Sequence, residues 1–483
     1  MTLDSGICYR ALRARDARFD GRFFVAVSST RIYCRPICTV RPPKRENCRF
    51  FASAAAAESS GYRPCLRCRP ELAPGNASVD ATTRLAQAAA TLLEDRAQDE
   101  EGLDAVATRL GVTDRHLRRA FGAEFGVSPV EFAQTQRLLL AKRLLTDTAL
   151  PVTEVAFASG FGSVRRFNAL FRERYRLKPG QLRGQKQNGA LPAADALQFE
   201  LSFRPPFDWP AVSAFLGARA IAGVEALEDG RYRRTVRIAG DGKERTGWIA
   251  IEPSPRKPTL RVAVSASLVK VLPPVLSRVK ALMDLACNPA EVAQALGALA
   301  KSHPGLRVPG AFDGFEIAVR AILGQQVSVA GARTLAGRFA SAFGDPVETP
   351  FAMLSTLFPA APGIAGLTVG RIAKIGMPLA RARTIVALAH AVADGGLVLV
   401  PNADVESTLE TLRALPGIGE WTAQYIAMRA LSWPDAFPHT DLGVMKALDE
   451  KDAKRVLAAG EAWRPWRAYA VMHLWQSLAK EQR

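Results

Sequence analysis

Residues 415–425 read LPGIGEWTAQY, and this stretch decides the fold expected for the C-terminal part of the chain. Gly417 and Gly419 follow a proline and precede a run of helical character, which is the form of a helix-hairpin-helix turn. Glycines let the backbone approach a phosphate, and the N–H groups that open the next helix bind it without reading base sequence. The stretch predicts a DNA-holding element, and by itself it does not distinguish an enzyme from a binding protein.

The residues that follow the hairpin favour an enzyme. The run FPHTDLGVMKAL places Asp441 at an expected helix start about twenty residues downstream of the hairpin. A hairpin followed by such an aspartate is the signature of the helix-hairpin-helix base-excision glycosylases. Residues 197–483 further resemble the bacterial 3-methyladenine glycosylase II family, AlkA, in PPFDWPAVSAFLGARA, RAILGQQVSVA, GMPLARA and RPWRAYAVMHLW.

The resemblance implies a reaction and a set of residues for it. Asp441 would stabilise the oxocarbenium-like sugar and help water attack, as carboxylates do in glycoside hydrolysis, and its alternative role is that of a helix N-cap. Trp421, Tyr425 and Trp475 would form an electron-rich slot for a flipped, positively charged base, and their alternative role is packing in the core.

Two positions depart from other glycosylases. Trp421 stands where relatives with lyase activity carry a Schiff-base lysine, so we expect base release that leaves the abasic strand intact. Gln326 stands where the AlkA family can carry an apolar wedge that fills the vacated stack, so hydrophobic insertion is expected to be weaker. The chain has no cysteine after Cys287, so the iron–sulfur cluster of some relatives is not expected.

The cysteines point to a metal site near the N-terminus. Five of the seven fall between Cys34 and Cys68, and four of them have the spacing of two ligand pairs, Cys34-x3-Cys38-x26-Cys65-x2-Cys68. Four thiolates are the ligands of a closed tetrahedral zinc site, so one Zn²⁺ is the expected cofactor. The spacing alone is compatible with a purely structural zinc site and with buried free cysteines. Cys8, Cys48 and Cys287 lack partners at ligand spacing and are expected to be structural.

The residues around these cysteines carry a second resemblance. STRIYCRPIC, RENCRFF and GYRPCLRCRPE resemble the N-terminal domain of the Ada methylphosphotriester-repair family over nearly all of residues 1–75. The resemblance implies that Cys34, as a zinc-bound thiolate, accepts a methyl group from a DNA phosphotriester, with Cys38, Cys65 and Cys68 completing the site. It also places Thr30, Arg41 and Arg63 at DNA-backbone positions; a solvated surface role for these three is the alternative.

Residues 80–183 are expected to be helical throughout, with two helix-turn-helix units at 103–121 and 152–175. Gly111 and Gly160 mark the turns, and Thr113 is suited to start the second helix of the first unit. Two units in tandem, separated by a long helix and closed by RLKPGQLR, resemble the AraC-type DNA-binding domain. The outward residues expected to face DNA on the two recognition helices include Arg115, Arg118, Arg165 and Arg166.

Composition agrees with a DNA partner. The 483 residues carry a formal net charge of +18, and residues 1–75 hold 14 Lys and Arg against 6 Asp and Glu. A basic chain favours a polyanionic partner, because each cation placed on a phosphate releases a counterion. Neither an apolar run of membrane-spanning length nor a secretory signal is visible, so we expect a cytoplasmic protein with no membrane partner.

These observations predict a multidomain α+β protein of four parts. They are a small four-cysteine zinc domain (1–75), an all-α tandem helix-turn-helix domain (80–185), a small antiparallel-sheet α+β subdomain (197–305) and an all-α helix-hairpin-helix glycosylase domain (306–483). The expected partners are double-stranded and alkylated DNA, promoter DNA and, as a candidate, RNA polymerase. One alternative is a transcription regulator whose glycosylase half binds damaged DNA without catalysis, and another is an active glycosylase beside an inert zinc domain.

Overall fold

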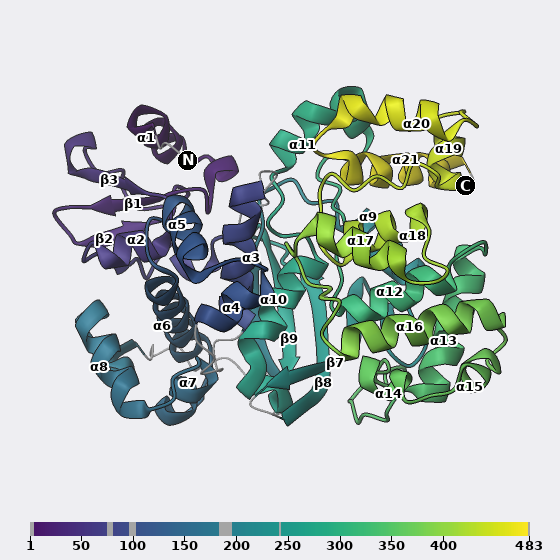
Figure 1. Cartoon of the computed structure of the whole chain (residues 1–483). Helices are drawn as coiled ribbons and strands as arrows, with labels where there is room; N and C mark the ends of the chain where they lie inside the picture. The colour runs from purple at the N-terminus through teal and green to yellow at the C-terminus, as the bar shows by residue number, and fades with distance from the viewer. Residues whose placement is uncertain (1–3, 75–80, 96–102, 183–195, 241–242, 482–483) are drawn as a thin grey trace.

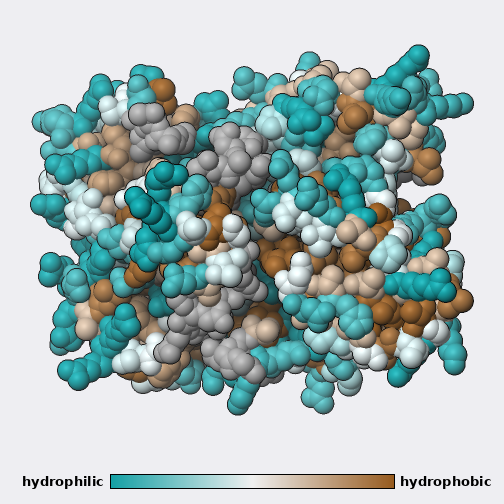
Figure 2. Space-filling model, in the orientation of Figure 1, coloured by the Kyte–Doolittle hydropathy of each residue, from teal (hydrophilic) through white to brown (hydrophobic). Residues whose placement is uncertain are grey.

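The computed structural model describes residues 4–74, 81–95, 103–182, 196–240 and 243–481. In Figure 1 the N-terminal elements lie on the left, the helices of the C-terminal part lie on the right, and a five-stranded sheet stands between them. The fold is therefore multidomain α+β, as the sequence predicts. Figure 2 shows hydrophilic and hydrophobic side chains mixed over the same face, with hydrophobic areas more frequent on the right. Within the described residues, no helix has the length and apolar character needed to cross a bilayer.

The N-terminal part is built on a small sheet with strand order β3-β1-β2-β4, in which only the β2–β4 pair is parallel. The run RFFVAVSSTRIY (residues 22–33) has a strand-like pattern and SAAAAESSGY (residues 53–62) a helix-like one, and the structure confirms both with β1, β2 and α2. The elements are α1 (Ser5–Ala14), β1 (Phe24–Val27), β2 (Ile32–Cys34), β3 (Cys48–Phe51), α2 (Ala54–Ser59) and β4 (Arg63–Pro64).

In the described residues up to 182 six α-helices follow, and α4 with α5 and α7 with α8 form the two expected helix-turn-helix units. Gly111 and Gly160 have φ of +66° and +84°, a left-handed conformation that glycine adopts without steric cost, which is why the chain turns there. Thr113 and Ser163 cap the second helix of each unit by accepting a hydrogen bond from the backbone N–H three residues later. The helices are α3 (Ala81–Asp95), α4 (Leu103–Arg109), α5 (Asp114–Phe125), α6 (Pro129–Asp147), α7 (Val152–Ala158) and α8 (Val164–Tyr175).

The central sheet is antiparallel throughout, with strand order β5-β9-β8-β7-β6. The runs LQFELSF, YRRTVRI, TGWIAIEP and TLRVAVSA, within residues 197–266, alternate like strands in the sequence, and β5, β7, β8 and β9 confirm them. The helix α9 (Trp209–Ala218), capped by Asp208, lies between the first two of these runs and was not predicted. Buried residues cover several sides of α9, so its sequence has no clear amphipathic period. The strands are β5 (Ala196–Ser202), β6 (Glu225–Glu228), β7 (Arg231–Gly240), β8 (Lys243–Pro253) and β9 (Thr259–Ser265).

From residue 268 to the end of the described residues the chain is helical, broken by Gly and Pro turns, which confirms the all-α prediction for the last part. The helices are α10 (Leu272–Leu282), α11 (Pro289–Leu296), α12 (Gly314–Leu323), α13 (Val329–Phe343), α14 (Ala361–Ala365), α15 (Val369–Ala373), α16 (Leu379–Ala393), α17 (Val405–Ala414), α18 (Glu420–Arg429), α19 (Leu442–Ala447), α20 (Ala453–Gly460) and α21 (Arg467–Glu481).

The cores do not follow the four expected parts. The largest buried cluster runs from Leu138 on α6, through the second helix-turn-helix unit and the central sheet, to Leu474 on α21. The first helix-turn-helix unit belongs to a separate cluster that includes Ala55 of α2. The apolar core of the first unit is therefore shared with α2 of the N-terminal part, and that of the second unit with the central sheet and the C-terminal helices. The domain boundaries given above stay predictions.

Candidate functional site

A cavity of about 1370 Å³ lies in the C-terminal part of the chain. Its walls include the end of α9, helices α12 and α13 with the loop between them, α16, the hairpin between α17 and α18 with the first turns of α18, the start of α19, and α21. The hairpin and the aspartate predicted from sequence therefore open onto one cavity. Among the residues that line it are Gln326, Gly417, Gly419, Trp421, Tyr425, Asp441 and Trp475.

Asp441 is held at the edge of this cavity by three hydrogen-bond donors. It caps α19, with Oδ1 accepting from the Val444 backbone N–H at 2.9 Å. The indole Nε1–H of Trp475 donates to the same oxygen at 2.9 Å, and that of Trp421 donates to Oδ2 at 2.8 Å. The N-cap role weighed as an alternative is therefore present. The two indoles orient the carboxylate, since charge-assisted hydrogen bonds are short and directional.

The three predicted aromatic residues lie together. The rings of Trp421 and Tyr425 stack with centroids 5.4 Å apart, and those of Tyr425 and Trp475 are 6.3 Å apart and tilted by 43°. Phe215 of α9, to which the sequence analysis assigned no role, stacks on the Trp475 ring at 6.2 Å. A planar base between two rings needs about 7 Å, twice a contact distance of ~3.5 Å. Neither the Trp421–Tyr425 spacing nor the Tyr425–Trp475 spacing admits a base, so a base has to stack on an outer face of this aromatic group.

A group of guanidinium side chains surrounds the hydroxyl of Tyr425, and sequence analysis did not predict it. Arg429 donates to this hydroxyl at 2.9 Å. Burial alone would raise the pKa of Tyr425, but the neighbouring cations of Arg429, Arg219 and Arg320 lower it overall. Burial lowers the pKa of Arg219 to about 10, which leaves its guanidinium charged at neutral pH. Arg219 and Arg320 line the cavity, and no local pattern in the sequence signals their approach.

The hairpin has the geometry of a tight turn. Gly417 has φ of +81°, and a Cβ on it would lie 2.3 Å from Thr384 Oγ1 on α16, so only glycine fits there. Gly419 is the N-cap of α18 with φ of −90°, and a Cβ on it would meet nothing within 4 Å. The space around Gly419 at the start of α18 is therefore open. Gln326 lies in the facing loop, exposed and with φ of +56°.

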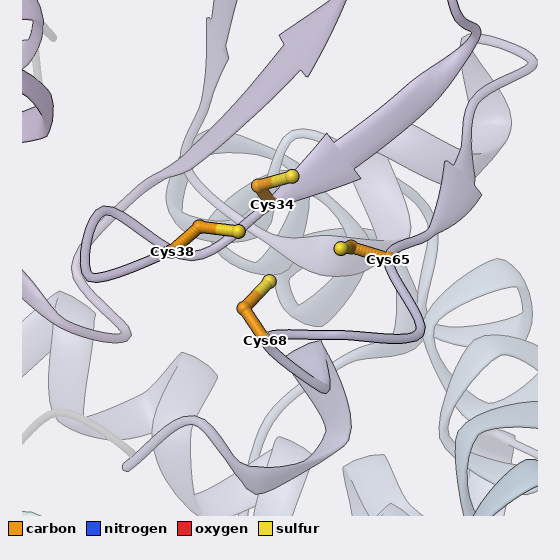
Figure 3. Close-up of side chains that lie close together, drawn as sticks. All are labelled: Cys34, Cys38, Cys65 and Cys68. Atoms are coloured by element: carbon orange, nitrogen blue, oxygen red, sulfur yellow. The ribbon is translucent and has the colours of Figure 1, made fainter. Parts of the chain in front are cut away.

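The four predicted ligand cysteines converge in the N-terminal part, as Figure 3 shows. Cys34 ends β2, Cys38 follows it in a loop, and Cys65 and Cys68 follow β4. Their sulfur atoms all lie within 4.8 Å of one another. Tetrahedral Zn–S bonds of about 2.3 Å bring sulfur atoms to about 3.8 Å, so the cluster fits one Zn²⁺ after a small contraction. The predicted four-cysteine zinc site is confirmed.

The other cysteines lie outside this cluster, and most of the predicted DNA-facing residues are exposed. Burial raises the pKa of Cys8 and of Cys287 to about 11, which makes both poor nucleophiles and agrees with structural roles. Cys48 is partly buried on β3, where burial raises its pKa as well. Arg63 is half-buried, and Arg118 Nε forms an ion pair with Asp114 Oδ2 at 2.7 Å. The other side chains expected to face DNA are exposed: Thr30, Arg41, Arg115, Arg165 and Arg166, as is Arg118.

Three family profiles match the chain. The metal binding domain of Ada matches residues 7–71, a helix-turn-helix domain matches residues 106–185, and the AlkA N-terminal domain matches residues 198–313. The helix-turn-helix match overlaps the range in which we expected that domain, and the Ada match covers the zinc site.

Whole proteins resemble the chain as well. A probable bifunctional transcriptional activator/DNA repair enzyme AlkA of Mycobacterium tuberculosis is 40% identical over 98% of this chain and 96% of its own. DNA-3-methyladenine glycosylase 2 of Escherichia coli is 37% identical over 57% of this chain and 96% of its own. The bifunctional transcriptional activator/DNA repair enzyme Ada of the same organism is 38% identical over 29% of this chain and 38% of its own.

Proposed function

This chain belongs to the family of bifunctional transcriptional activator/DNA repair enzymes, and from that premise we propose that Asp441 is the carboxylate with which it releases alkylated bases from DNA. The family relationship makes the C-terminal part a DNA-3-methyladenine glycosylase. The observation that carries the proposal is the Asp441 carboxylate, held by two indole N–H groups at the edge of the cavity.

The residues around the cavity account for each step of base release. The phosphate backbone binds at the open N-terminus of α18, and the damaged nucleotide leaves the stack, which costs least where damage has weakened pairing. The base stacks on the outer faces of the aromatic group. The negative charge of Asp441 then stabilises positive charge on the sugar as the bond between C1′ and the base nitrogen breaks. The bonding electrons leave with the base and neutralise its positive charge; water then adds to C1′ and passes a proton to Asp441 or to solvent.

The reaction stops at the abasic strand. The Trp421 side chain offers an indole N–H to Asp441 and has no amine that could form an imine with C1′. We expect this chain to release free 3-methyladenine and 7-methylguanine from alkylated duplex DNA. The strand should break only after alkali treatment. Nicking before alkali would contradict a purely hydrolytic reaction, and binding of damaged DNA without base release would favour a regulator that lacks catalysis.

The zinc site adds a proposed second reaction. Zinc, when bound, keeps the four thiols deprotonated at neutral pH. The Cys34 thiolate would attack the methyl carbon of a methyl phosphotriester, so that an S–C bond forms and the C–O bond breaks, with its electrons left on the phosphate. The transfer removes one negative charge from the cluster and raises its affinity for DNA. Thr30, Arg41 and Arg63 would position the backbone.

Methyl transfer has a direct readout. After incubation with DNA that carries methyl phosphotriesters, the peptide that contains Cys34 should gain the mass of one methyl group. A protein that holds zinc and gains no methyl group on any of the four cysteines would have an inert structural site.

The helix-turn-helix part carries the regulatory side of the proposal. Arg115 and Arg118 on α5, and Arg165 and Arg166 on α8, are exposed on the second helices of the two units, the position that enters the major groove in such motifs. We place promoter DNA there, with RNA polymerase as the partner that activation requires and the cytoplasm as the compartment. Footprinting on the promoter of the chain's own gene, before and after Cys34 methylation, tests this part.

A further inference from the structure

Gln325 joins two parts of the cavity wall that are distant in the sequence. It lies between the end of α12 and Gln326, and its side-chain Nε2–H₂ group donates to the backbone carbonyl of Gly417 and to Thr422 Oγ1, at 2.9 Å in both cases. Gly417 belongs to the hairpin and Thr422 to the first turn of α18. One amide group therefore spans from the loop that carries the wedge position to the element that binds phosphate.

The main chain of Gln325 is held from the other side. Arg381 on α16 donates from Nη2 to the Gln325 carbonyl at 2.7 Å. The same helix supplies Thr384, which lies so close to Gly417 that no side chain fits between them. Helix α16 thus contacts both the wedge loop and the hairpin, and Gln325 closes the connection between them.

This connection has consequences for Gln326. Its backbone is left-handed, an uncommon conformation for a residue with a side chain, and its side chain is exposed at the cavity edge. A polar tip gains less from insertion between bases than an apolar one does, so its effect depends on being held in place. The fixed neighbour Gln325 supplies that restraint, because its bonds tie the loop to the hairpin that grips the phosphate.

We propose that Gln325 is a positioning residue that keeps the Gln326 tip at a constant distance from the phosphate-binding hairpin. Phosphate binding and duplex opening then act as one event. The inference rests on the proposed glycosylase function and deepens it. Gln325 does not reach the reacting atoms in this scheme, so it affects how the nucleotide leaves the duplex and not how the glycosidic bond breaks.

The test compares a paired and an unpaired lesion. Gln325→Met keeps the length of the side chain and removes both donor bonds. With 3-methyladenine in a fully paired duplex, single-turnover release should slow by about tenfold or more, since opening the pair has to be driven by the protein. With the same lesion in single-stranded DNA, the change should be under about threefold, because there is little pairing left to break. An equal loss on both substrates, or no loss on either, would overturn the proposal.

Two further variants separate positioning from general damage. Thr422→Val removes one acceptor of the same amide, and it should slow release only from the paired substrate. In the double variant with Gln325→Met, the fold-loss in rate should be smaller than the product of the two single fold-losses, because both changes remove the same hydrogen bond. If Gln325→Met does not fold, this variant alone gives the same paired-to-unpaired comparison. Gln181→Met, which removes a side-chain acceptor of the Lys178 N–H in the helix-turn-helix part, is the matched control and should leave both rates unchanged.

Failure of the proposed function can be recognised separately. If the unmodified chain releases no base from either substrate, the glycosylase proposal is wrong. The positioning role is then decided by the fluorescence of 2-aminopurine placed beside the lesion, which rises when a base leaves the stack. Binding of the unmodified chain should raise this fluorescence, and binding of the Gln325→Met variant at saturation should not. The same rise with both proteins would refute the role of Gln325.

Discussion

Replacing Asp441 by asparagine tests the central assignment. The substitution preserves the shape of the side chain and removes its negative charge. An asparagine whose oxygen takes the place of Oδ1 still accepts from Val444 N–H and Trp475 Nε1–H. Its amide nitrogen then faces the Nε1–H of Trp421, which loses its acceptor. The variant thus loses one of three hydrogen bonds and keeps the cap of α19.

The two consequences have different sizes. One indole donor that is left without a partner costs roughly 1 kcal/mol of folding stability, because Trp421 is only partly buried. The lost charge matters more for the reaction: a unit charge about 4 Å from the developing positive charge on the sugar is worth about 4 kcal/mol at an effective dielectric constant of ~20. That energy corresponds to about a thousandfold in rate. We expect Asp441→Asn to fold normally and to release base about a thousand times more slowly.

The assay is single-turnover release of free 3-methyladenine from alkylated duplex DNA, with enzyme in excess so that binding does not limit the rate. Asp452→Asn is the matched control, because Asp452 also caps a helix, by accepting from Lys454 N–H at 2.9 Å, and does not line the cavity. Release by the control should equal that of the unmodified chain. If Asp441→Asn kept more than about a tenth of the rate, the lost charge would be worth under about 1.4 kcal/mol, and the electrostatic reasoning would be refuted.

Four other predictions concern the cavity, the buried Glu58 of the N-terminal part and the zinc site. Trp475→Phe keeps an aromatic side chain and removes one donor to Asp441. A hydrogen bond to a charged group is worth ~1.5–3 kcal/mol, so the rate of single-turnover release should fall by about 10- to 100-fold. An unchanged rate would mean that this bond does not orient the carboxylate. Gly417→Ala forces a side chain into a left-handed position against α16, at a cost of about 1–2 kcal/mol or more in folding stability. Denaturant unfolding should show this lower stability, and fluorescence anisotropy should show weaker binding to damaged and undamaged DNA alike. Equal DNA affinity would argue against phosphate binding at this turn. Burial raises the pKa of Glu58 to about 7 from an ordinary 4.5, so the folded chain holds this proton more tightly than the unfolded chain, and folding stability falls as pH rises from about 4.5 to 7. Glu58→Gln should remove this pH-dependent loss and, in denaturant titrations at pH 8, be more stable than the unmodified chain by roughly 3 kcal/mol. Parallel stability–pH profiles for the two proteins would contradict this prediction. Cys38→Ser should abolish stoichiometric zinc by metal analysis while base release persists, since the cavity is built from other segments; zinc retained at full occupancy would exclude this ligand set.

Much of the molecule could be predicted from local sequence. The cysteine spacing indicated the zinc site, the glycines at Gly111 and Gly160 marked the two helix-turn-helix units, and the hairpin followed by Asp441 indicated the cavity. Each of these signals is contained in a few consecutive residues, because capping, tight turns and paired ligands are local in chain distance. The helix α9 escaped prediction because burial on several of its sides removes the amphipathic period.

The sequence by itself therefore determined which parts the chain contains and which residue types their chemistry uses. Only the tertiary structure decided how these residues meet: indoles from α18 and α21 converge on the carboxylate at the start of α19, and Gln325 reaches the hairpin over 92 positions. It also decided that the two helix-turn-helix units share cores with different neighbours. The physical reason is that contacts between distant segments depend on how whole helices pack, and such packing leaves no periodic pattern or fixed spacing within any one segment.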